Sequence, residues 1–232
     1  MRPRVLLFAG LLCAHAEIID RIAVSVGNSV ITESEIRHQL KIRAFVEGAP
    51  LKLDEENKRA AADRLIEQSL IRREMQASRY SGAEPAQAQA LLAGLKQSRF
   101  QGDEPAYQAE LKRARLTEAD VESSFLWQLT VLRFVEFRFR PGIQIAAEEV
   151  REYYEQKYLP NWKARTAGKP PAFEEAERAC EEILTQERID NQLDRWISLS
   201  RTQTNIRYRD DVLRDRQPTA VQPATAAPKV QP

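Results

Sequence analysis

The chain contains little of what enzyme active sites and metal centres are usually built from. Its 232 residues include two cysteines, two histidines and eight glycines. The sequence has neither the G-x-S-x-G motif of hydrolases nor the H-E-x-x-H motif of metalloproteases. It also has no glycine-rich loop that could cradle a phosphate. The sequence therefore predicts no catalytic apparatus and no nucleotide or metal cofactor.

The first sixteen residues have the three parts of a secretory signal peptide. Arg2 and Arg4 form a basic start, Val5 to Cys13 is a short apolar run, and Ala14-His15-Ala16 is an A-x-A cleavage signal. The apolar run is too short to span a bilayer. We therefore expect residues 1–16 to be removed, and the exported chain to begin near Glu17.

Removal of the signal peptide would leave one cysteine, Cys180, and one histidine, His38. One cysteine cannot form an internal disulfide, and the pair is too far apart in sequence to indicate a metal cluster or a nucleophile with its base. We interpret Cys180 as a small apolar residue on a helix face. Without Arg2 and Arg4, 33 basic residues face 34 acidic ones, which excludes the basic footprint of a nucleic-acid binder.

The strongest local signal is a β-hairpin followed by a helix. Branched and small residues alternate over Ile22 to Val26, Gly27-Asn28 suits a tight turn, and Ser29 to Ile31 is the return strand. Thr32 and Glu35 then form a T-x-x-E capping box at the start of a helix. A two-stranded hairpin is marginal in water and needs a third strand or a covering helix.

Apolar residues at helical spacing predict a mainly α protein around the hairpin. The segment Leu159 to Ala172 holds three prolines and a glycine and is predicted to be a loop. Residues 214–232 are rich in Pro, Ala and Gln and are predicted to be disordered. The expected helices after the first one are Asp54 to Ser78, Glu84 to Gln97, Glu104 to Ala114, Thr117 to Arg138, Glu148 to Tyr158 and Phe173 to Ser200; a further strand-like segment is Asn205 to Tyr208.

The helix that begins after Thr117 is the most apolar and has two apolar faces. Trp127 and Phe134 lie seven residues apart on a face that the main stripe does not include. Such a helix is either wrapped by neighbours on both sides, here by the C-terminal helix, or partly exposed for a ligand. The main stripe is Val121, Phe125, Leu129, Leu132, Val135 and Phe139.

In this order of elements the chain resembles the SurA family of periplasmic chaperones. The resemblance rests on the hairpin IDRIAVSVGNSVITESEI, on RLIEQSLIRREM in the following long helix and on EEVREYYEQKY further along. It implies an N-terminal chaperone domain over residues 17–158, completed by a helix and strand over residues 173–213. In that family the last strand returns to the N-terminal hairpin, so the resemblance implies a small antiparallel sheet formed by the hairpin and a C-terminal strand, with Ile206 to Tyr208 as the candidate. Most members carry parvulin prolyl isomerase domains between these pieces. Here the gap is only residues 159–172, so the resemblance implies a chaperone without isomerase activity.

The resemblance implies a periplasmic holdase that binds unfolded exported polypeptides, such as precursors of outer-membrane proteins. Large aromatic side chains off the main stripe or in the loop are the candidate peptide-binding residues. Two alternatives stay open: an enzyme related to prolyl isomerases, and an adaptor that docks on one envelope partner. The candidate residues are Trp127, Phe134, Phe137 and Trp162.

Overall fold

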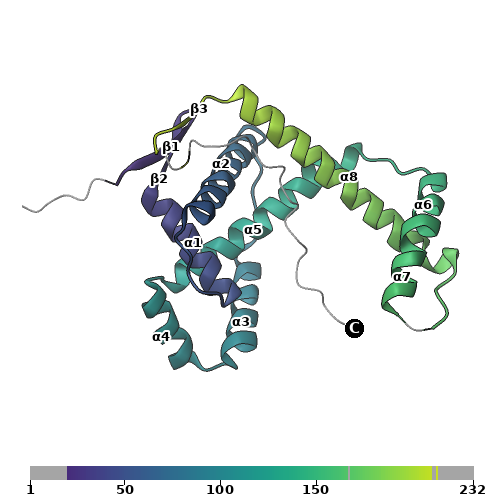
Figure 1. Cartoon of the computed structure of the whole chain (residues 1–232), viewed down its shortest axis with the longest axis horizontal. Coiled ribbons are helices and arrows are strands. Elements are labelled where there is room, and N and C mark those ends of the chain that lie inside the picture. Colours follow the sequence, from purple (N-terminus) through teal and green to yellow (C-terminus); the bar gives the residue numbers. More distant parts are fainter. Residues whose placement is uncertain (1–19, 167, 211–212, 214–232) are drawn as a thin grey trace, which may run out of the picture.

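The computed structural model describes residues 20–166, 168–210 and 213. The predicted signal peptide and the predicted disordered tail lie outside these residues. The fold class is confirmed: the protein is mainly helical, with one small antiparallel sheet (Figure 1). The elements in chain order are β1 (Ile22–Val26), β2 (Ser29–Thr32), α1 (Glu33–Glu47), α2 (Glu55–Ala77), α3 (Pro85–Phe100), α4 (Glu104–Ala114), α5 (Glu118–Phe139), η1 (Arg140–Gly142), α6 (Ala147–Tyr153), η2 (Tyr154–Tyr158), α7 (Leu159–Arg165), α8 (Phe173–Gln203) and β3 (Ile206–Tyr208).

The two ends of the described chain meet in the sheet, whose strand order is β2-β1-β3. Val24 in the central strand pairs with Ile31 on one side and with Tyr208 on the other. Gly27 has a φ of 58°, and its N–H donates to the Asn205 carbonyl at 2.9 Å. Asn28 does not have a positive φ, which fits a turn with only its first central residue left-handed. The expected third strand is confirmed.

Side-chain caps fix where several helices begin, which is why the sequence located them well. The Thr32 hydroxyl accepts from the Glu35 N–H, and the Glu35 carboxylate accepts from the Thr32 N–H at 2.7 Å. Asp54 caps α2 through the Asn57 N–H. Thr117 and Asp120 form a second reciprocal box at the start of α5. Each cap satisfies N–H groups that have no partner inside the helix.

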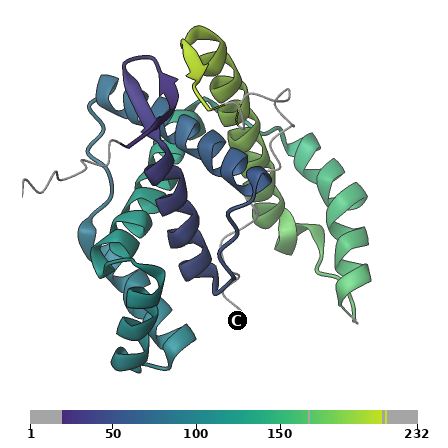
Figure 2. The same cartoon turned by 60° about the vertical axis from the view of Figure 1, so that its left-hand side comes forward.

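The sheet, α1 to α5 and the C-terminal half of α8 form what we call the body. One buried cluster joins the sheet to α1 and α2, with Val24 and Ile66 fully enclosed. A second cluster joins α1 to α3, α4 and α5 around Tyr107. Helix α8 lies across α5 and α2, and in both views β3 follows it back to the hairpin (Figures 1 and 2).

The N-terminal half of α8 packs with α6, η2 and α7 into a smaller unit that we call the arm. At 1.5 Å per residue the 31-residue α8 is about 46 Å long, so it reaches from the sheet to the far end of this arm. The arm has its own buried cluster of Val150, Tyr154, Ala176 and Cys180. The chain therefore has a body and an arm connected by α8 and by the short segment after η1 (Figure 1).

The prediction of a loop over the whole of Leu159 to Ala172 is wrong, because α7 occupies Leu159–Arg165. Proline inside an α-helix lacks an N–H, and its ring clashes with the carbonyl four residues earlier. Here Pro160 follows the π-turn η2, in which the Leu159 N–H donates to the Tyr154 carbonyl five residues back. The wider turn makes room for the proline ring. Residues 166 and 168–172 are non-helical, as predicted.

Candidate functional site

The four predicted peptide-binding residues do not lie together. Trp127, Phe134 and Phe137 are on α5, whereas Trp162 is on α7 in the arm, away from α5 (Figure 1). Trp162 is half-buried, and its ring lies against Gly168, where a Cβ would be 3.7 Å from the ring. The structure therefore separates Trp162 from the other three residues.

Phe134 and Phe137 lie one turn apart on α5 but differ in exposure. Phe137 is 60% exposed, the highest value of any large apolar side chain that the structure describes, whereas Phe134 is 1% exposed. Ile71 and Met75 of α2 cover Phe134, together with Trp196 of α8. The prediction of Phe134 as a surface residue is therefore wrong, because two helices cover this face of α5. The alternative of a buried position was correct for Phe134.

Tyr80 places a further ring over α5. Its ring centroid lies 5.3 Å from that of Phe134, at an interplanar angle of 68°, and 5.3 Å from that of Phe137. Both separations lie in the range of favourable aromatic pairs. We call the following rings the aromatic patch: Tyr80 and the partly buried Trp127, which pack against the cluster of the buried Phe134, and the exposed Phe137, which pairs with Tyr80.

The end of α2 explains how Tyr80 reaches this position. Arg79 takes a left-handed φ of 54°, and the Tyr80 N–H donates to the Met75 carbonyl at 2.9 Å. The Arg79 N–H donates to the Gln76 carbonyl, which completes a Schellman motif with arginine at the position that glycine usually takes. Such a motif folds the next side chain back onto the helix. Sequence reasoning missed Tyr80, although an apolar residue just after a helix end is the signal of this motif.

Arg72 is the second residue of this surface that the sequence did not reveal. Its guanidinium carbon lies 4.1 Å from the centroid of the Trp127 ring. A cation over the indole face is attracted by the ring quadrupole, by ~0.5–1 kcal/mol at an exposed site. The stack holds the Trp127 ring in place while the ring stays partly accessible. Arg72 lies about one and a half turns before the end of α2, and no local pattern in the sequence showed that α2 faces Trp127.

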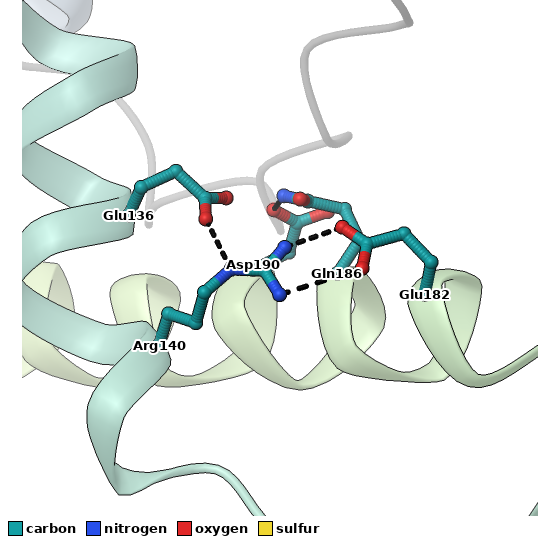
Figure 3. A network of polar contacts seen from close by, with 5 residues as sticks. All are labelled: Glu136, Arg140, Glu182, Gln186 and Asp190. Atoms are coloured by element: carbon teal, nitrogen blue, oxygen red, sulfur yellow. Dashed lines mark hydrogen bonds and ion pairs between the residues drawn. The ribbon is translucent and has the colours of Figure 1, made fainter. Parts of the chain in front are cut away.

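The joint between body and arm is polar on one side and apolar on the other. Arg140 lies between Glu136, whose carboxylate accepts from Nε at 2.6 Å, and Glu182 of α8 (Figure 3). The hydrogen bond with Glu182 and that with Glu136 raise the pKa of the Arg140 guanidinium. Beside this network, Phe139 and Ile189 are buried in a shared apolar cluster. These contacts fix the direction in which the arm leaves the body.

The residues with reactive side chains do not converge. Cys180 is fully buried in the arm, and burial raises the pKa of its thiol, which keeps it in the unreactive neutral form. His38 of α1 lies 3.3 Å from a carboxylate oxygen of Asp120. Among residues 20–166, 168–210 and 213, no three His, Cys, Asp or Glu side chains are grouped so that they could hold a metal ion.

Asp120 caps the start of α5 together with Thr117 and also contacts His38. Partial burial acts to raise the pKa of its carboxyl, but hydrogen bonds from the Thr117 hydroxyl and N–H and the neighbouring His38 outweigh burial, so the pKa lies below its usual range. A lowered pKa means that the ionised carboxylate is favoured in the folded state. Folding therefore gains stability from Asp120 at neutral pH, and this gain is lost as the pH falls through the lowered pKa.

Comparisons with known proteins do not place the chain in a family. No family model matches the sequence, and a search of curated proteins found no match. In the part of the chain that the structure describes, no helix has both the length and the apolar composition needed to cross a membrane.

Proposed function

We propose that the protein is a SurA-like holdase, a periplasmic chaperone that binds unfolded exported polypeptides without catalysing proline isomerisation. Precursors of outer-membrane proteins are the proposed clients. The resemblance of the hairpin, of the α2 segment and of α6 to the SurA family supports this proposal. The sheet that joins the N-terminal hairpin to the C-terminal strand also supports it, because the resemblance implies that arrangement.

The single observation that carries the proposal is the aromatic patch. Phe137 is 60% exposed and pairs with the partly accessible ring of Tyr80, and the ring of Trp127, ten residues earlier on α5, is also partly accessible. Water contact with such rings is unfavourable, and a partner that covers them gains apolar burial of ~25 cal/mol per Å². Unfolded polypeptides offer aromatic and branched side chains for this purpose. Rings bind many such sequences, since apolar contact and stacking need no fixed hydrogen-bond pattern.

The test follows light scattering as a denatured outer-membrane protein is diluted into buffer with and without the purified protein. We expect suppressed aggregation at stoichiometric amounts, and less suppression by the Phe137→Ala variant. A parallel assay measures proline isomerisation of a short peptide, where we expect no rate above background. Unchanged aggregation at a molar excess would contradict the proposal and favour an adaptor with one folded partner. Measurable isomerisation would instead favour the enzyme alternative.

Leu132→Ala is the matched control for Phe137→Ala. Leu132 is 58% exposed on the same helix, five residues before Phe137 and therefore on a different side of α5. Both substitutions remove a similarly exposed apolar side chain from α5. We expect Leu132→Ala to suppress aggregation like the unmodified protein. Equal losses in both variants would indicate general stickiness of α5 and not a defined binding surface.

A further inference from the structure

Each surface ring of the aromatic patch has an arginine that contacts it or lies close to it in the sequence. Arg72 stacks on Trp127, Arg79 directly precedes Tyr80, and Arg133 lies one turn before Phe137 on α5. All three arginines are exposed. One arginine stacks on its ring and the other two are close to theirs in sequence; these residues come from the end of α2 and from residues 127–137 of α5.

The positive charge of this surface is only partly neutralised. Arg138 of α5 pairs with Glu74 of α2 at 3.5 Å. In contrast, no ion pair with a carboxylate of the described residues is found for Arg72, Arg79 or Arg133. The chain as a whole has a net charge of only +1. Three exposed arginines without such an ion pair therefore lie at the patch, whereas Arg138 is paired with Glu74.

From this combination we infer that the aromatic patch selects unfolded segments in which aromatic residues are flanked by acidic ones. The inference rests on the proposed function and specifies its client class. Aromatic side chains of the client would pack among Tyr80, Trp127 and Phe137, while its carboxylates would meet the three arginines. Arginine binds carboxylates through a planar donor fork and also stacks on rings, so one residue type serves both contacts.

An anionic membrane surface would also attract arginine and aromatic residues. The patch fits a polypeptide better, because Phe137 is its only strongly exposed ring and Tyr80 and Trp127 are partly buried. Insertion into a lipid interface needs a continuous apolar face along a helix. Phe137 lies between two charged residues of α5, Glu136 and Arg138, and both of these form ion pairs.

The test uses three fluorescently labelled peptides with the same aromatic residues, separated by glutamate, by glutamine or by lysine. Binding to the purified protein is measured by fluorescence anisotropy. We expect the glutamate peptide to bind roughly three- to tenfold more tightly than the glutamine peptide, the size of one or two exposed ion pairs. The lysine peptide should bind most weakly. The differences should vanish at about 1 M salt, where charges are screened beyond about 3 Å.

Arg133→Glu is the informative variant, since Arg133 is exposed and the change leaves the rings in place. We expect this variant to bind the glutamate peptide more weakly and the lysine peptide more tightly, with the affinity for the glutamine peptide unchanged. Arg178→Glu, at an exposed position of α8 in the arm, makes the same charge change far from the patch and should leave all three affinities unaltered.

The outcomes separate failure of this inference from failure of the proposed function. Equal affinities for the three peptides would overturn the selectivity and leave the holdase proposal standing. Loss of binding to all three, together with unchanged aggregation of the denatured client, would overturn both. Binding to vesicles of anionic lipid without binding to any peptide would overturn the inference in favour of a membrane surface.

Discussion

Phe134 and Phe137 provide the sharpest test of the proposal that α5 carries one ring needed for stability and another that binds clients. Phe134 is 1% exposed, so Phe134→Ala removes a ring from a packed site and should cost ~3–5 kcal/mol of unfolding free energy. Phe137 is 60% exposed and keeps mainly its contact with Tyr80. Phe137→Ala should therefore cost only about 1 kcal/mol.

The two variants should behave in opposite ways in the two assays. Urea unfolding followed by circular dichroism should show a large loss of stability for Phe134→Ala and a small one for Phe137→Ala. Client binding is measured without urea, at a temperature at which both variants are folded. It should be weakened chiefly by Phe137→Ala. If Phe137→Ala lost as much stability as Phe134→Ala, or bound clients normally, the division between a buried and a binding ring would be refuted.

Three further predictions concern the sheet, the joint and the cap of α5. Val24→Ala in the central strand should cost about 2 kcal/mol in urea unfolding, whereas Val30→Ala, 51% exposed in the same hairpin, should change stability by less than about 0.5 kcal/mol. Arg140→Gln and Glu182→Gln should each lower the free energy of unfolding by less than about 1 kcal/mol. Each should also broaden the distribution of distances between spin labels placed on the body and on the arm. Unchanged distributions would contradict the claim that the joint fixes the direction of the arm. Asp120→Asn should reduce the loss of stability between about pH 5 and pH 3, measured as urea midpoints.

Local signals explain why so much of the fold was predictable. The alternating strand, the turn at Gly27 and the capping boxes at Thr32 and Thr117 each depend on residues within a few positions of one another. These signals placed the hairpin and the start of α5 correctly. The C-terminal strand Ile206–Tyr208 was expected because the hairpin needs a partner, and the resemblance suggested where that partner lies.

Features that depend on distant packing or on a rarer helix geometry were not predictable in the same way. Proline and glycine content indicated a loop at Leu159, whereas a π-turn before Pro160 lets the helix continue. Leu132 was assigned to the same apolar stripe of α5 as Val135 and Phe139, which pack with Ile189 of α8, but Leu132 itself is 58% exposed. Only the fold decides which apolar residues of α5 remain free.

The candidate site was predictable in part for the same reason. Trp127 and Phe137 were identified as large rings off the main stripe, and both belong to the aromatic patch. Periodicity could not separate Phe134 from Phe137, since the covering side chains come from α2 and α8. Tyr80 and Arg72 belong to the patch through a Schellman motif and a helix pairing that no local pattern specified.

Site-specific cross-linking tests the central claim most directly. A photoreactive amino acid replaces Phe137 in one variant and Leu132 in another, and each is illuminated in the presence of a denatured outer-membrane protein. The account predicts a strong adduct from position 137 and little from position 132, although the two side chains are similarly exposed. Equal adducts from both positions, or none from position 137, would contradict the claim that the aromatic patch holds unfolded polypeptides.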